Sequence, residues 1–184
     1  MVPTAAVAVE ERVTLKCRFG CPHYGRGHAC PPRVPSPAEF RRVLGEYHYA
    51  LIAAFPSAAL LTGAESRSLQ RTRADAKADA AAKERVEHFY RDWERSKAVA
   101  FEAIMTLERE AFNAGEPLAL ALRPSRCTLC AECNVDRPCL NPTRLRFSPE
   151  AVGVNLAETC RRAEMNLVFP FDKNPSHIGM VLLG

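Results

Sequence analysis

Four cysteines crowd one short stretch of the chain: Cys127, Cys130, Cys133 and Cys139. Two residues separate Cys127 from Cys130 and Cys130 from Cys133, a spacing that lets three sulfurs fold around one face of a compact inorganic core. Cys139 follows after a longer excursion and is expected to close the site. The stretch therefore predicts a 4Fe-4S cluster held by four thiolates.

Zinc is the alternative metal for this stretch, because four thiolates also satisfy its tetrahedral coordination. Zinc ligands usually come as two separated pairs of cysteines, whereas three evenly spaced thiols suit a larger core. The stretch also departs from the bacterial ferredoxin pattern, in which proline directly follows the fourth cysteine. Here Pro142 stands three places beyond Cys139. We therefore predict an iron-sulfur cluster outside a simple ferredoxin domain.

Three more thiols, Cys17, Cys21 and Cys30, form a second group near the N-terminus. Their spacing leaves three arrangements open. Cys160 is the fourth ligand in one; in another the two groups exchange ligands, with Cys139 completing the N-terminal site and Cys160 the other. In the third arrangement the cluster keeps three thiolates and leaves one iron open to water, a histidine or a substrate. Only this last arrangement creates a chemical site.

Histidines and arginines surround the N-terminal thiols. His23 and His28 are candidate ligands of an open iron, although a purely polar role in the loop is the simpler interpretation. The neighbouring cations are Lys16, Arg18, Arg26 and Arg33. They offset the negative charge of a thiolate-bound cluster or, in a functional interpretation, bind an acidic substrate or partner. Arg18, His23 and His28 are thus the candidate cofactor-binding side chains.

Alternating strands and helices must position these groups. A weak alternation over residues 12–16 predicts a short strand that leads into Cys17, with an irregular loop after it. Apolar runs predict three further strands, at residues 47–55, 117–122 and 176–183. The first of these should be central in the sheet. Both cysteine groups are then expected to follow strands.

Three helical regions complete the prediction. Ser36-Pro37-Ala38-Glu39 is typical of a helix start, and Ser148-Pro149-Glu150 begins another before a helix at residues 157–165 that carries Cys160. From a possible capping box at Thr62 to a C-cap at residues 113–115 the chain predicts one long helix or two. The apolar stripe of its second half is expected in the core: Val86, Phe89, Tyr90, Trp93, Phe101, Ile104, Met105, Leu107 and Phe112. The fold class is α+β or α/β, with a small central sheet and one domain over residues 1–184.

Composition bounds the function classes. The 25 basic and 21 acidic residues leave too small an excess of positive charge to indicate a nucleic-acid-binding protein. The N-terminus lacks a basic leader and no apolar run is long enough to span a bilayer, so we expect a cytoplasmic protein with no membrane partner. In a reducing compartment eight cysteines indicate metal binding or catalysis rather than disulfides.

The cysteine motifs resemble those of the DUF2284 family, described as predicted metal-binding proteins of prokaryotes. The resemblance rests on Cys17-Arg-x-x-Cys21-Pro-x-Tyr24-Gly25, Cys30-Pro-Pro, the Cys127 to Cys139 group and Glu150-Ala-Val-Gly-Val-Asn155. It implies two metal sites, expected to be iron-sulfur. Because Cys160 is not part of these motifs, the resemblance favours a four-cysteine cluster and a three-cysteine site.

Three functions follow from these residues. The first is an iron-sulfur protein with one or two 4Fe-4S clusters that transfers electrons to a redox partner protein. The second is an enzyme whose three-cysteine cluster offers an open iron to a small-molecule substrate, for instance in desulfuration of a thio-compound. The third is an interaction module stabilised by zinc, without turnover. The sequence leaves the oligomeric state open.

Overall fold

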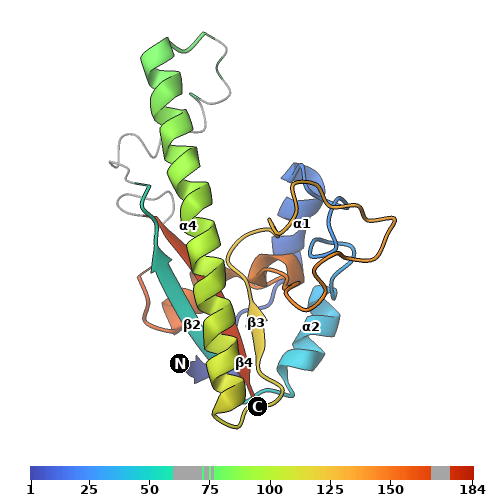
Figure 1. Cartoon of the computed structure of the whole chain (residues 1–184). Helices are drawn as coiled ribbons and strands as arrows, with labels where there is room; N and C mark the ends of the chain where they lie inside the picture. The colour runs from blue at the N-terminus through green and yellow to red at the C-terminus, as the bar shows by residue number, and fades with distance from the viewer. Residues whose placement is uncertain (60–71, 73–74, 76, 167–174) are drawn as a thin grey trace.

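A four-stranded antiparallel sheet forms the centre of the fold (Figure 1). The computed structural model describes residues 1–59, 72, 75, 77–166 and 175–184. The strand order is β1-β2-β4-β3. The strand bounds are β1 Val2–Pro3, β2 Tyr49–Pro56, β3 Leu120–Leu122 and β4 Ser176–Leu183. Since the paired strands run antiparallel and helices cover the sheet, the fold class is α+β.

Strands β2 and β4 pair over their whole length, with Ala50 opposite Leu182 and Ile52 opposite Met180. This pairing confirms that the apolar run at 47–55 forms an inner strand, because β1 and β4 flank it. Strand β4 has the predicted limits. Strand β3 is shorter than the apolar run at 117–122, and it runs directly into the segment that carries Cys127.

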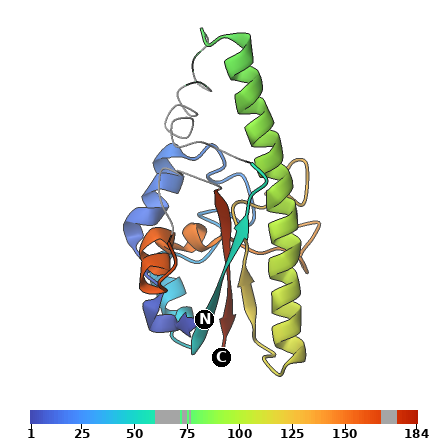
Figure 2. The ribbon, with the colours of Figure 1, turned by 90° about the vertical axis from the view of Figure 1, so that its left-hand side faces the viewer.

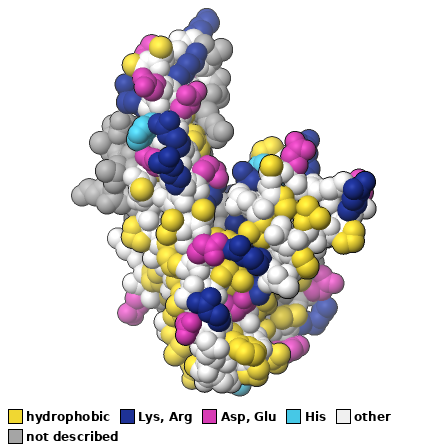
Figure 3. Space-filling view, in the orientation of Figure 1, with side chains coloured by type: hydrophobic (Ala, Val, Ile, Leu, Met, Phe, Trp, Pro, Cys, Tyr) yellow, Lys and Arg dark blue, Asp and Glu magenta, His cyan; other side chains and the backbone are white. Residues whose placement is uncertain are grey.

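Helix α4, Ala80–Asn113, covers one face of the sheet. Phe101 and Ile104 of this helix pack against Ala121 and Val181 of the sheet. A Cβ at Gly179 would come within 3.2 Å of the Ile104 side chain, so glycine allows this close approach. Figure 2 shows α4 on one side of the sheet and the other helices on the opposite side. The N-terminal end of α4 projects beyond the sheet, and acidic and basic side chains intersperse along it in Figure 3.

The opposite face of the sheet is covered by shorter elements. These are α1 Glu11–Gly20, α2 Pro37–Leu44, the 3-10 helix η2 Pro149–Val152 and α5 Leu156–Arg162, with a further 3-10 turn η1 at Thr4–Ala6. Phe40, Val152 and Cys160 pack with Met180 and Leu182 in this larger part of the core. The sheet is thus buried from both sides, as the apolar strand sequences require.

Side-chain caps fix where several of these helices begin. Ser36 and Glu39 form the predicted capping box of α2, with Ser36 N donating to Glu39 Oε2 at 2.8 Å. Ser148 caps η2, which is a single 3-10 turn instead of an α-helix. Asp79 caps α4 by accepting from Ala82 N at 2.7 Å. The long helix therefore begins at residue 80, and the predicted capping box at Thr62 lies outside the described residues.

Three further predictions are corrected. Residues 12–16 belong to helix α1, so the predicted strand is wrong and so is the expectation that the N-terminal thiols follow a strand. The alternation there was short, and the segment is rich in Glu, Arg, Leu and Lys, which favour helix. Cys17 consequently lies in a helix and not in an irregular loop. Phe112 is 60% exposed although its neighbour Ala111 packs against the core, so Phe112 lies off the buried face of α4.

Within the described part of the chain, no helix combines the length and the apolar character that crossing a lipid bilayer requires.

Candidate metal centre

The two cysteine groups lie side by side at one end of the fold (Figure 1). His28 ties them together across 106 and 109 residues of chain. Its Nε2 donates to the backbone carbonyl of Asn134 at 3.1 Å and to that of Arg137 at 2.9 Å. These bonds occupy Nε2, so His28 acts here as a bridge that holds one cysteine segment against the other.

The larger of two cysteine-lined cavities has a volume of about 550 Å³. All four thiols of the second group and Cys30 line it: Cys127, Cys130, Cys133, Cys139 and Cys30. Arg26, Arg126 and His23 also border the cavity. All four cysteines of the second group thus border one common space.

The smaller cavity has a volume of about 280 Å³ and contains all three thiols of the N-terminal group, Cys17, Cys21 and Cys30. Cys30 lines both cavities, as do His23, Ala29 and Arg126, so the two spaces are neighbours. The other side chains around the smaller cavity include Tyr24, His23, Lys97, Arg126 and Glu150.

Helix α1 positions the first two N-terminal thiols. Cys17 lies in its last turn and Cys21 follows its end, with Cys21 N donating to Cys17 O at 3.3 Å. Residues four apart on a helix share a face, which explains why these two thiols meet the same cavity. A turn then delivers the third thiol, because Cys30 N donates to Gly27 O at 3.1 Å.

Crowding of the thiols has an electrostatic cost. Burial raises the pKa of Cys17, and the neighbouring Cys21 and Glu150 add to the effect. Burial likewise raises the pKa of Cys30, with contributions from thiols of both groups. A bound metal reverses this preference, because a coordinated thiol loses its proton outright. The donor set therefore fits a positively charged metal core.

Two hydrogen bonds reach the sulfurs of the second group. Asn141 donates its backbone N–H to Cys139 Sγ at 3.3 Å and its side-chain Nδ2 to Cys130 Sγ at 3.2 Å. Donors aimed at ligand sulfurs stabilise thiolates and tune the potential of an iron-sulfur cluster. Asn141 is thus suited to support a centre in the larger cavity.

Arg123 is a fully buried cation between β3 and the second cysteine group. Its guanidinium lies 4.2 Å from the ring centroid of Phe101, and Nη2 donates to Thr128 Oγ1 at 3.3 Å. Nε and Nη1 have no hydrogen-bond partner among the described residues. Burial lowers the pKa of Arg123, while the nearby Cys127 and Cys30 thiolates oppose that change. A buried cation needs an anion, and thiolates around a metal core supply one.

Glu150 brings a second buried group without a partner. Its Oε2 is buried and accepts no hydrogen bond from any described residue. Burial raises the pKa of Glu150, and the hydroxyl of Ser148 only partly opposes this. Two cations line the same small cavity, but one of them, Lys97, pairs with Glu94 at 2.5 Å. The carboxyl group thus faces the three N-terminal thiols with one oxygen unused.

The remaining predicted site residues have different surroundings. His23 borders both cavities, and burial together with Arg126 and Arg26 lowers its pKa. Arg18 lines a neighbouring hollow with Tyr24 and is not among the residues of either cysteine cavity. Cys160 is fully buried in the apolar core and lines neither cavity. This placement does not support Cys160 as the ligand that completes the N-terminal site.

Sequence reasoning missed Arg123, Lys97, Asn141 and Glu150 as parts of the site. Lys97 carried a usable signal, since it interrupts the apolar stripe of α4 four residues after Trp93 and four before Phe101. A charge on a buried stripe needs a reason. Glu150 carried no such signal, because an acidic residue in the first turn is ordinary at a helix start.

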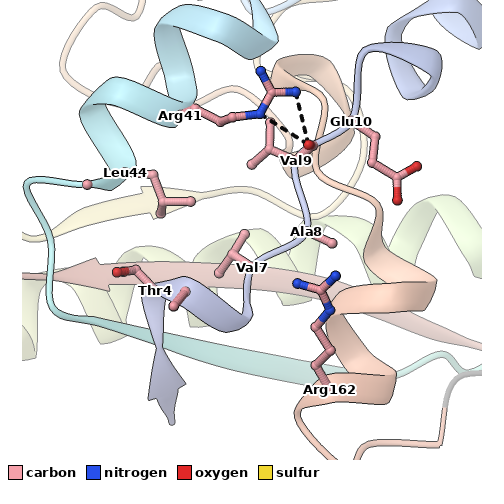
Figure 4. A pocket seen from close by; sticks show the side chains of 10 residues that line it. Thr4, Val7, Ala8, Val9, Glu10, Arg41, Leu44 and Arg162 are labelled. Carbon is pink, nitrogen blue, oxygen red and sulfur yellow. Dashed lines mark hydrogen bonds between the residues drawn. The ribbon is translucent and has the colours of Figure 1, made fainter.

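Another hollow, of about 460 Å³, lies between the N-terminal segment, α2 and α5 (Figure 4). Arg41 spans it, with Nε and Nη2 donating to Val9 O at 3.3 and 3.0 Å. Arg162 reaches into it from α5. The residues that line this hollow include neither cysteine nor histidine, so it offers a metal neither a sulfur nor an imidazole ligand.

Within the described residues, no three His, Cys, Asp or Glu side chains form a group that could hold a single metal ion. Four sulfurs on one zinc ion lie about 3.8 Å apart, given a Zn–S distance of about 2.3 Å and a tetrahedral arrangement. Ligands of a cluster stand further apart, because several irons and sulfides lie between them. The cavities that the thiols enclose are therefore the relevant feature.

Comparison with known proteins identifies the family of this chain. No curated protein and no solved structure matches the chain. A family of predicted metal-binding proteins, DUF2284, matches residues 1–183, which is nearly the whole length. The metal-binding description agrees with the chemistry of the two cysteine-lined cavities. This protein belongs to the DUF2284 family of predicted metal-binding proteins.

Proposed function

We propose that this protein binds two iron-sulfur clusters and relays electrons between them and a partner protein. The first cluster belongs to Cys127, Cys130, Cys133 and Cys139, and the second to Cys17, Cys21 and Cys30. The observation that carries the proposal is that two cysteine-lined cavities share Cys30. Centres held in two neighbouring cavities would meet the requirement of electron relay, which is proximity of the cofactors.

Two features support iron-sulfur chemistry over a zinc module. The even spacing of the second cysteine group suits a core with several metals. Arg123 and Arg126 add positive charge next to Cys127, and Arg123 has no carboxylate partner among the described residues. A cluster with four thiolates is a net anion, and such cations offset the cost of burying it.

The chain's own residues then have defined tasks. Thiolates bind the clusters, and Asn141 stabilises two of those sulfurs. Arg123 neutralises part of the charge from within the core, while His28 keeps the two segments in register. The clusters supply the redox chemistry, and the protein sets their separation and potential.

Catalysis at the N-terminal site is a second candidate function. The observation that favours it is the count of three thiols around the smaller cavity, beside a carboxyl group with an unused oxygen. An iron with only three protein sulfurs nearby can accept a further ligand. A small thio-compound that binds there and loses its sulfur is one such substrate class.

Metal analysis of anaerobically purified protein tests the proposal. We expect about eight irons and eight sulfides per chain for two 4Fe-4S clusters, and a spectrum that dithionite bleaches reversibly. Cys130→Ser and Cys17→Ser should each remove about half of the iron. Cys160→Ser is the matched control, because this thiol lies in the apolar core, and it should retain all the iron. Colourless, zinc-loaded protein would contradict the proposal in favour of the zinc module.

A further inference from the structure

We infer that Glu150 supplies the fourth ligand, a carboxylate oxygen, to the centre held by Cys17, Cys21 and Cys30. The inference rests on the proposed function, since it assumes a cluster at this site. Three thiols line the smaller cavity, and a cubane cluster has four irons to ligate. Glu150 lines the same cavity with a buried oxygen that no described residue engages.

The backbone holds Glu150 in the same framework as the thiols. It lies in η2, where Ser148 caps the turn and accepts from Ala151 N. The C-cap, Gly153, has a φ of +90°, and an added Cβ would lie 2.7 Å from Pro37, so only glycine fits there. Gly153 O in turn accepts from Glu10 N at 2.7 Å, directly before the helix that carries Cys17 and is followed by Cys21.

Hydrogen bonds within the turn account for only part of this carboxyl group: its own backbone N–H and the Ser148 hydroxyl reach it, but Oε2 has no partner among the described residues. A buried carboxylate normally pairs with a cation or accepts several hydrogen bonds. Of the two cations that line this cavity, Lys97 is engaged by Glu94 at 2.5 Å, and Arg126 makes no hydrogen bond to Oε2. Glu150 Oε2 is thus buried without a partner in a cavity that three thiols also line, and a metal centre would provide that partner.

An oxygen ligand gives this iron a distinct chemistry. Carboxylate is harder than thiolate, and it binds iron less firmly than sulfur within a cluster. The Glu150-bound iron is thus the position at which a small thiolate or carboxylate compound exchanges with the protein ligand. Such exchange changes no oxidation state and needs no further reactant.

Mössbauer spectroscopy of the wild-type protein, loaded with ⁵⁷Fe and sulfide, tests the ligand without any substitution. We expect one iron with a larger isomer shift than the others, as oxygen coordination requires. The signal should belong to the cluster that Cys17→Ser removes. A wild-type spectrum in which every iron has sulfur-only coordination would overturn the inference.

Variants identify the residue that is responsible. Glu150→Cys should convert the distinct iron to sulfur coordination while leaving the iron count unchanged. Glu87→Gln is the matched control, because Glu87 is an exposed carboxyl on α4 that lines neither cysteine cavity, and it should leave the spectrum as in wild type. If the distinct iron persists in Glu150→Cys but disappears in His23→Ala, the ligand is His23 and the inference fails.

The proposed function and the assignment of Glu150 as a ligand can be refuted separately. If wild-type protein binds no iron-sulfur cluster under anaerobic reconstitution, the proposed function and this inference both fall. If both clusters assemble but Glu150→Cys leaves the distinct iron unaltered, only the ligand assignment falls.

Discussion

Replacing Arg123 by methionine separates what the fold needs from what the cluster needs. In the metal-free protein two of the guanidinium nitrogens are buried without a hydrogen-bond partner among the described residues, and each lowers the stability of the fold by about 1–3 kcal/mol. The cation–π contact with Phe101 returns about 2 kcal/mol. The bond to Thr128 returns about 1 kcal/mol. These contributions nearly cancel, so methionine, of similar length, should change the free energy of unfolding by no more than about 2 kcal/mol.

The loaded protein should respond differently. A unit charge about 6 Å from a cluster contributes roughly 3 kcal/mol at an effective dielectric constant of about 20. Reduction adds one negative charge to the cluster, so removing the cation should lower the potential of the Cys127 cluster by about 100 mV. The cluster should also be lost faster to a chelator.

Two measurements check these values. Urea unfolding of reduced, metal-free protein gives the stability, and an EPR-monitored redox titration gives the potential. Arg144→Met is the matched control, because Arg144 lies over the same Phe101 ring at 5.3 Å but is 45% exposed. It should alter neither quantity appreciably. A metal-free Arg123→Met protein destabilised by more than about 4 kcal/mol, with an unchanged cluster potential, would refute the counterion role.

Three further outcomes are expected. Glu108→Gln should lower the free energy of unfolding, measured in urea, by about 3 kcal/mol, because Glu108 binds Arg146 at 2.6 and 2.8 Å and both side chains are largely buried. Adding Arg146→Met to Glu108→Gln should restore most of the lost stability. If the two substitutions instead lower stability additively, the ion pair is not what stabilises the fold. Burial lowers the pKa of His177 to about 4, so stability should fall by about 3 kcal/mol as pH drops from about 6.5 to 4. Between these pH values His177 is protonated in the unfolded chain but not in the folded one, so lower pH favours unfolding. His177→Gln should remove this part of the pH dependence of stability. Asn141→Leu should lower the potential of the second-group cluster by about 40 mV, whereas an unchanged potential would show that its bond to sulfur has no redox effect.

The elements with strong local signals were predictable from sequence. Strand β4 has its predicted limits because its mostly apolar residues have no other stable place than the inside of a covered sheet. Helix α2 begins where its proline and capping box indicate. The error at α1 has the opposite cause: its residues are mostly exposed or half-buried, so no apolar periodicity marked the helix. The four-residue step from Cys17 to Cys21 was the available sign of helix there.

The metal-binding groups divide in the same way. The proposed cysteine ligands could be predicted from sequence, because the spacing of such ligands is set by the size of the core that they enclose. Groups that come together only in the folded protein could not be predicted in this way. Arg123 resembles any basic residue at the end of a strand, and only its complete burial shows that it needs an anion.

Glu150 makes the physical limit clear. Its position in sequence indicates a helix start, and Ser148 does cap the turn there. The same turn is held against α1 through Gly153 and Glu10, and that tertiary contact brings the carboxyl group to the thiols of another segment. A local pattern therefore accounts for the backbone at Glu150 and says nothing of its side-chain chemistry. The unused oxygen acquires meaning only when the cavity it faces is known, and a fourth ligand for three thiols is what that cavity lacks.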